Sequence, residues 1–223
     1  TQIVRATLSR TRRAFSEALA TRPHGNGLSL LLHAGAALHS GGASLPAAAA
    51  GVAAKAVAEG RRAALPWVFL GVSGSAAAQL ACARTFAADR FPAAATPLWR
   101  GERYRHDRIR VAYLSADFHE HATAHLIAGL FEMQDDARFE LTAVSFGPET
   151  NDPMRERLRR AFPHFVDVRD RSDGDVAAML RQSEIDIAVD LKGFTANSRT
   201  GILALRPAPL QVNYLGYPGT MGA

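Results

Sequence analysis

Residues 109–121 read Ile109-Arg-Val-Ala-Tyr-Leu-Ser-Ala-Asp-Phe-His-Glu-His121, an apolar run that ends in a polar segment. Apolar residues at helical spacing follow over 123–133, so we expect a strand, a loop and a helix in succession. The same alternation continues toward the end of the chain. We expect strands over 109–114, 139–146, 165–168, 185–191 and 210–215, and helices over 123–133, 153–162, 173–182 and 199–205. Strands that alternate with helices predict an α/β fold with a Rossmann-like parallel sheet.

The first hundred residues have a different pattern. Their apolar and alanine-rich stretches predict helices over 3–19, 28–38, 47–64 and 75–88, with Pro66 expected to break the third of these. No 34-residue repeat stands out, so the pattern alone does not establish tetratricopeptide repeats. We therefore expect a helical region over 1–100 and an α/β region over 101–223. The stretch 92–107, with its prolines and glycine, is the best linker candidate.

Composition limits the classes of protein that this chain can represent. Its 223 residues are 48% hydrophobic and 21% charged, which is typical of one or two globular domains. A single cysteine, Cys82, excludes an internal disulfide, favours a reducing compartment and is expected to be a small core residue. No run of about 18 uncharged apolar residues predicts a membrane span.

The net charge of +5 is unevenly distributed. Residues 1–100 hold 11 Lys and Arg against 3 Asp and Glu, whereas residues 101–223 hold 15 against 18. The basic half lacks the interleaved aromatic residues or the motif that nucleic-acid modules use. We therefore expect no nucleic-acid partner.

Ligands of parallel sheets bind beyond the carboxyl ends of the strands, so three loops are candidates: 115–121, 192–198 and 216–223. A histidine in the first loop is suited to accept a proton near neutral pH or to orient a substrate hydroxyl. Zinc ligation by His119, His121 and His125 is an alternative, and ordinary surface histidines are another. In the second loop, Gly193 and Thr195 suit a polar ligand, or the loop merely starts a helix. The glycine-rich third loop can bring backbone N–H groups to a ligand, or can be a plain turn.

Three segments carry a resemblance to a known family. They are Tyr113-Leu-Ser-Ala-Asp-Phe-His-Glu-His121, Asp186-Ile-Ala-Val-Asp-Leu-Lys-Gly-Phe-Thr195 and Ala204-Leu-Arg-Pro-Ala-Pro-Leu-Gln-Val-Asn-Tyr-Leu-Gly-Tyr-Pro-Gly-Thr-Met-Gly-Ala223. Over about 108–223 the chain resembles the O-GlcNAc transferase family, the nucleocytoplasmic protein glycosyltransferases that include the SPINDLY proteins. Residues 1–100 resemble, more loosely, the helical region that precedes the catalytic lobes and often continues a tetratricopeptide array.

The resemblance implies a two-lobed GT-B fold, of which this chain would be the N-terminal lobe without the C-terminal lobe. It implies inverting transfer of a sugar, usually GlcNAc from UDP-GlcNAc, to Ser or Thr hydroxyls of proteins, with no metal or other cofactor. The implied partners are protein or peptide acceptors, the nucleotide sugar and the missing lobe, in the cytoplasm. Relatives that use GDP-fucose or UDP-glucose leave the donor open, and the chain alone is expected to be inactive.

The resemblance also implies roles for individual residues. His121 aligns with the active-site histidine of the family and is the expected catalytic residue. The expected substrate-binding residues are Asp117, Thr195, Gly216, Tyr217, Pro218, Gly219 and Thr220. Ala122 and Phe194 stand where the family often has proline and tyrosine, but neither change removes a proton-transfer group. A non-catalytic peptide-binding scaffold and a zinc-dependent hydrolase are the competing hypotheses.

Overall fold

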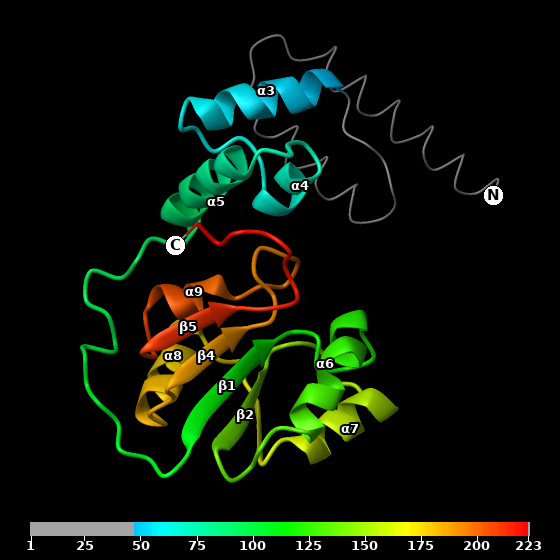
Figure 1. The fold of residues 1–223 in the computed structure, drawn as a ribbon, viewed down its shortest axis with the longest axis vertical. Coiled ribbons are helices and arrows are strands. Elements are labelled where there is room, and N and C mark those ends of the chain that lie inside the picture. The colour runs from blue at the N-terminus through cyan, green and yellow to red at the C-terminus, as the bar shows by residue number, and fades with distance from the viewer. Residues whose placement is uncertain (1–46, 223) are drawn as a thin grey trace, which may run out of the picture. The chain divides into compact units, whose positions relative to one another are not determined.

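The computed structural model describes residues 47–222 (Figure 1). The chain divides into two compact units: Phe91–Pro218 forms one, and Thr1–Arg90 with Gly219–Ala223 forms the other. The helices expected over 3–19 and 28–38 lie outside the described residues. No helix in the described part of the chain combines the length and the apolar character needed to cross a membrane.

The described part of the first unit consists mainly of helices α3 (Ala47–Ala58), α4 (Pro66–Leu70) and α5 (Ala76–Arg90). Its core is built from small side chains around Phe69, and Cys82 is buried in it as expected. Burial raises the pKa of the Cys82 thiol to about 11. The expected role of Pro66 is wrong. The alanine-rich helix ends earlier, at Ala58, and Pro66 begins α4, because proline fits the first turn of a helix.

The second unit is an α/β fold with a five-stranded sheet. Its strands are β1 (Ile109–Ser115), β2 (Phe139–Ser145), β3 (His164–Asp167), β4 (Ile187–Asp190) and β5 (Leu210–Asn213). Its helices are α6 (Ala122–Glu132), α7 (Pro153–Ala161), α8 (Asp173–Gln182) and α9 (Thr200–Ala204). All pairs are parallel and the order is β3-β2-β1-β4-β5. The predicted Rossmann-like parallel sheet is confirmed.

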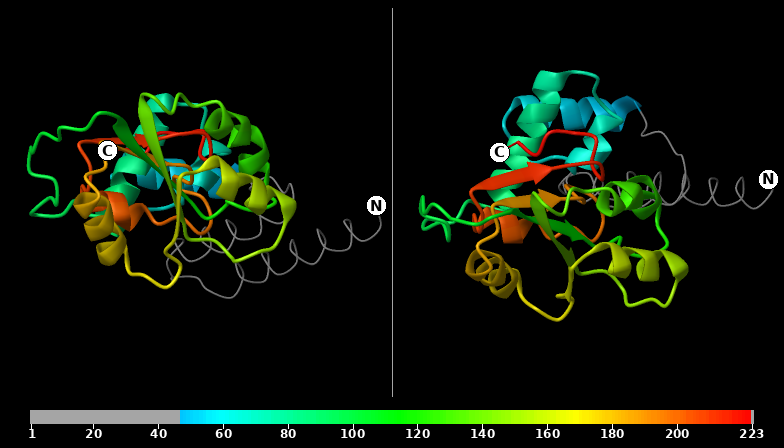
Figure 2. Two further views of the ribbon diagram at one scale, coloured as in Figure 1. Left: turned by 90° about the horizontal axis from the view of Figure 1, so that it is seen from below. Right: turned by 60° about the horizontal axis from the view of Figure 1, so that its bottom comes forward.

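Alternate side chains of the central strand β1 pack on opposite faces of the sheet. Val111 and Tyr113 pack with apolar residues of α6 and α7, whereas Ala112 and Leu114 pack with those of α8 and α9. Figures 1 and 2 show α6 and α7 together on one side, away from α8 and α9. The central strand β1 is therefore covered on both faces, which explains why it is apolar on both sides.

The segment between α5 and β1 is attached to the α/β unit by backbone hydrogen bonds. The N–H groups of Ala94 and Leu98 donate to the carbonyls of Ala204 and Leu205, at 3.1 and 2.9 Å. Arg181 of α8 donates from Nε to the Leu98 carbonyl at 3.2 Å. These bonds fix the course of the chain before it enters β1.

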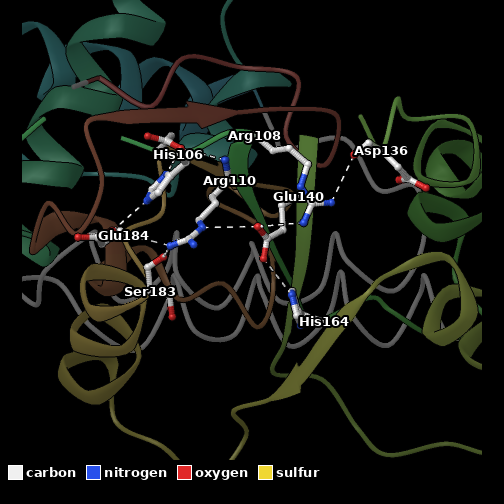
Figure 3. A network of polar contacts seen from close by, with 9 residues as sticks. His106, Arg108, Arg110, Asp136, Glu140, His164, Ser183 and Glu184 are labelled. Carbon is white, nitrogen blue, oxygen red and sulfur yellow. Dashed lines mark hydrogen bonds and ion pairs between the residues drawn. The ribbon is translucent and has the colours of Figure 1, made fainter. Parts of the chain in front are cut away.

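Charged side chains gather at the amino ends of the strands (Figure 3). His106 reaches Glu184 at 2.9 Å and Asp186 at 3.2 Å, one through each ring nitrogen. Glu140 lies 3.4 Å from Arg108 and 3.1 Å from His164. The Glu184 hydrogen bond is the main cause of a raised pKa for His106. This network joins the approach to β1 with the starts of its neighbours.

Candidate functional site

The candidate site lies at the opposite edge, where β1 and β4 end side by side. Leu114 of β1 is in register with Asp190 of β4, and the chain leaves β1 toward β2 on one side and β4 toward β5 on the other. This is the switch point at which open parallel sheets bind ligands. The loops after β1 and β4 are two of the three that the sequence indicates.

The loop after β1 is fixed from inside the protein. Ser115 accepts the N–H of Asp117 on its hydroxyl at 2.9 Å. The ring of Phe118 is 1% exposed and lies edge-on to Phe131 and Phe162 in the core. The loop therefore has a defined course between the strand and α6.

Arg155 of α7 also holds this loop, and the sequence does not reveal its role. It is fully buried and donates from Nη1 to the Phe118 carbonyl at 3.1 Å and to Ser145 Oγ at 3.3 Å. Asp167 lies 3.5 Å from Nη2, and burial lowers the pKa of the guanidinium. An arginine in a helix as basic as α7 is typical of a solvated face, so only the tertiary structure identifies this one.

His121 is the N-cap of α6. Its Nδ1 atom accepts the backbone N–H of Thr123 at 3.1 Å, which satisfies a free donor of the first turn. The side chain is 41% exposed, and Nδ1 lies 3.6 Å from Asp117 Oδ2, too far for a hydrogen bond. The ring of His119 lies 5.8 Å from the His121 ring. His121 is thus anchored through one nitrogen while part of its ring faces solvent.

Asp117 and Lys192 form a buried ion pair between the loops after β1 and β4. Lys192 Nζ lies 2.7 Å from Asp117 Oδ2, and the two residues are 6% and 7% exposed. Asp117, which the resemblance places among the substrate contacts, therefore contacts Lys192 and lies beside His121. The sequence signal for Lys192 is a charged residue directly after a buried strand.

The backbone after β4 is held by Asp190. Its carboxylate accepts the N–H groups of Lys192 at 2.8 Å and of Gly193 at 3.1 Å. Burial raises the pKa of Asp190 despite these hydrogen bonds. Thr195, another expected substrate contact, donates from Oγ1 to the Lys192 carbonyl at 2.9 Å. Lys192 is therefore hydrogen-bonded to three residues: Asp117, Asp190 and Thr195.

The third loop packs closely on the second. A Cβ on Gly216 would lie 1.8 Å from the Leu191 carbonyl oxygen. Gly193 has a φ of +55°, and a Cβ there would lie 2.4 Å from Tyr217 Cβ. The Tyr217 ring is 5.7 Å from that of Phe194. Glycine is required at both positions, because the two loops cross in contact.

The predicted site residues are only partly brought together. Asp117, Thr195, Gly216 and Tyr217 lie at the carboxyl edge of the sheet, each close to one of the residues 191–193. His121 lies at the same edge, beside Asp117. Pro218 ends the α/β unit, whereas Gly219 and Thr220 belong to the helical unit. There Thr220 Oγ1 accepts the N–H of Gly222 at 3.2 Å. The roles of all these residues in substrate binding stay predictions.

The three histidines of the first loop make separate contacts. His125 Nε2 lies 2.5 Å from Glu120 Oε1, and His121 caps α6. Within residues 47–222, no three His, Cys, Asp or Glu side chains are grouped so as to hold a metal ion. The expectation of a metal-independent reaction rests on the family resemblance and stays a prediction.

Comparisons with known proteins match the α/β unit. The model of glycosyl transferase family 41 matches residues 95–223. A probable UDP-N-acetylglucosamine–peptide N-acetylglucosaminyltransferase of Arabidopsis thaliana, SEC, is 36% identical over 116 residues, 52% of this chain and 12% of its own length. The UDP-N-acetylglucosamine–peptide N-acetylglucosaminyltransferase of Caenorhabditis elegans is 36% identical over 132 residues, 57% of this chain and 12% of its own length.

A solved structure agrees with these matches. A mutant of the Thermobaculum terrenum O-GlcNAc transferase superposes with a TM-score of 0.60 and 27% identity, over 70% of this chain and 31% of that one. The chain thus spans about an eighth of the length of these two relatives and about a third of the solved structure. The family model matches more than half of the chain and includes all three loops of the candidate site. The chain belongs to glycosyl transferase family 41.

Proposed function

We propose that this chain is part of an inverting protein glycosyltransferase that moves GlcNAc from UDP-GlcNAc to Ser or Thr hydroxyls of proteins. The proposal rests on the observation that the residues matched by the family include the loops in which polar contacts gather. The family match covers the loops after β1, β4 and β5, and polar contacts of the α/β unit gather in the first two of these loops. Two relatives named as peptide N-acetylglucosaminyltransferases align over more than half of the chain.

In this proposal the α/β unit supplies a rigid edge against which acceptor and sugar are held. The buried contacts of Asp117, Lys192 and Asp190 fix the loops before any ligand binds, so little ordering is needed on binding. Holding two reactants in line lowers the barrier by about 7–11 kcal/mol in favourable cases. His121, anchored through Nδ1, offers Nε2 to the reacting groups.

The remaining parts of the reaction belong to a second lobe. In the proposal that lobe binds the nucleotide and stabilises the charge that develops on its diphosphate as the sugar leaves. The 223-residue chain alone is then inactive, and the full-length protein acts on protein acceptors in the cytoplasm without a metal. A donor panel decides between GlcNAc and the fucose or glucose alternatives.

The test uses the full-length protein, host lysate as acceptor, EDTA, and UDP-GlcNAc, UDP-glucose or GDP-fucose as donor. The informative variant is His121→Asn, because asparagine also caps helices and so removes the imidazole without removing the cap. The control is His164→Asn, another half-exposed histidine but at the opposite edge of the sheet.

We expect transfer from UDP-GlcNAc in the presence of EDTA, at least 100-fold lower in His121→Asn and unchanged in His164→Asn. Transfer from GDP-fucose or UDP-glucose alone would replace the donor in this proposal. No transfer from any donor would contradict the proposal and favour the scaffold hypothesis. Full activity of His121→Asn would contradict the role of His121 in the reaction.

A further inference from the structure

The contacts of His121 define which ring nitrogen carries its proton. The backbone N–H of Thr123 is a donor only, so the Nδ1 atom that accepts it at 3.1 Å has no proton. A neutral imidazole with a bare Nδ1 carries its proton on Nε2. In this arrangement Nε2 donates a hydrogen bond and is not available to accept a proton.

A buried carboxylate beside Nδ1 opposes this arrangement. Asp117 Oδ2 lies 3.6 Å from Nδ1, and a carboxylate next to an imidazole ordinarily accepts its N–H. Such a hydrogen bond would put a proton on Nδ1, release the N–H of Thr123 and leave Nε2 bare. His121 would then have the tautomer of a general base.

Lys192 weakens the attraction of Asp117 for a proton on Nδ1 of His121, because Lys192 binds the same carboxylate oxygen. Lys192 Nζ lies 2.7 Å from Asp117 Oδ2, almost 1 Å closer than Nδ1 of His121, and both partners are buried. The other titratable neighbours are engaged differently. Glu120 pairs with His125, and the His119 ring lies 5.8 Å from His121.

We propose that Lys192 is a positioning residue that, by pairing with Asp117, keeps the proton of His121 on Nε2 and makes this histidine a hydrogen-bond donor to the substrate. The role toward a substrate rests on the proposed glycosyl transfer. The tautomer itself does not, and it can be measured without any activity.

The test is a long-range ¹H–¹⁵N correlation spectrum of the 223-residue chain labelled with ¹⁵N-histidine, at pH 8. The chain has eight histidines, and the signals that disappear in His121→Asn identify those of His121. We expect a pyridine-like Nδ1 and a pyrrole-like Nε2 in the native chain. In Lys192→Met, which keeps most of the length of the side chain but not its charge, we expect the pattern of His121 to reverse.

Two further variants separate positioning from simple loss of packing. Lys192→Arg keeps the cation and should retain the native pattern. Asp117→Asn combined with Lys192→Met removes both charges and should restore it. This double variant also tests the proposal if Lys192→Met does not fold.

A pyrrole-like Nδ1 in the native chain would overturn the proposal. So would an unchanged His121 pattern in a folded Lys192→Met, or a reversed pattern in the double variant. If the native tautomer is confirmed while the full-length protein transfers no sugar, the proposed function fails and the assignment of Lys192 stands.

Discussion

Replacing Gly216 with alanine tests whether the loop after β5 must lie directly against the loop after β4. The added Cβ would lie 1.8 Å from the Leu191 carbonyl oxygen and 2.7 Å from its carbon, about 1.6 Å short of ordinary contact with the oxygen. This obstacle is backbone that follows β4, so no side chain can rotate aside. Overpacking a core costs about 1–3 kcal/mol, and a rigid obstacle places Gly216→Ala at the upper end, about 3 kcal/mol.

Urea unfolding followed by tryptophan fluorescence measures this cost. The chain has two tryptophans, so a Trp67→Phe background leaves Trp99 as the reporter of the α/β unit. With a slope of about 2 kcal/mol/M, a loss of about 3 kcal/mol lowers the urea midpoint by about 1.5 M. The slope itself should not change.

Gly129→Ala is the matched control. Gly129 lies within α6, and a Cβ there meets nothing within 4 Å. Alanine is the better helix former by about 1 kcal/mol, so the control should raise the midpoint. A midpoint for Gly216→Ala within about 0.3 M of the parent would refute the close approach of the two loops.

Two further predictions concern buried and titrating groups of the α/β unit. Arg155→Met should cost about 1–3 kcal/mol in the same urea assay, because it leaves the buried Phe118 carbonyl without its donor; an unchanged midpoint would show that this bond does not hold the loop. The pKa of His106 in the folded protein is above its usual 6.5, chiefly because of its hydrogen bond to Glu184. The stability that His106 adds is therefore complete below the pKa of the unfolded state. It is lost as the pH rises through the pKa of the folded state. The stability difference between the native chain and His106→Gln should thus be larger at pH 5.5 than at pH 8.5, and a difference that does not vary with pH would contradict the assignment.

Local sequence patterns predict most of the elements of the α/β unit, because the periodicity of a strand or a helix depends only on residues that are close in sequence. The expected strand over 109–114 and helix over 123–133 lie within one residue of β1 and α6. The expected strand over 185–191 is longer than β4, because an apolar run does not show where pairing stops. The prediction for Pro66 is wrong for a related reason, since proline is found both after the end of helices and in their first turn.

The site is harder to predict than the elements that carry it. The resemblance points to His121 and Asp117, but nothing local connects Asp117 with Lys192, 75 residues away. Their contact depends on β4 lying beside β1, which is a property of the strand order. Arg155 is missed because its burial depends on what packs over α7. Pairings between distant residues come from tertiary structure, and a single sequence does not display them.

The position of β1 in the sheet has a consequence for biosynthesis. Val111 pairs with Ile187, so one side of β1 has no partner until a further 76 residues have been made. At about 5–20 residues per second, the ribosome needs about 4–15 s to supply them. During that interval the apolar strand β1 has one unpaired edge, the kind of surface on which nascent chains aggregate or to which chaperones bind. The pairing of Lys192 with Asp117 completes only after β4 has docked, so it marks the end of this vulnerable period.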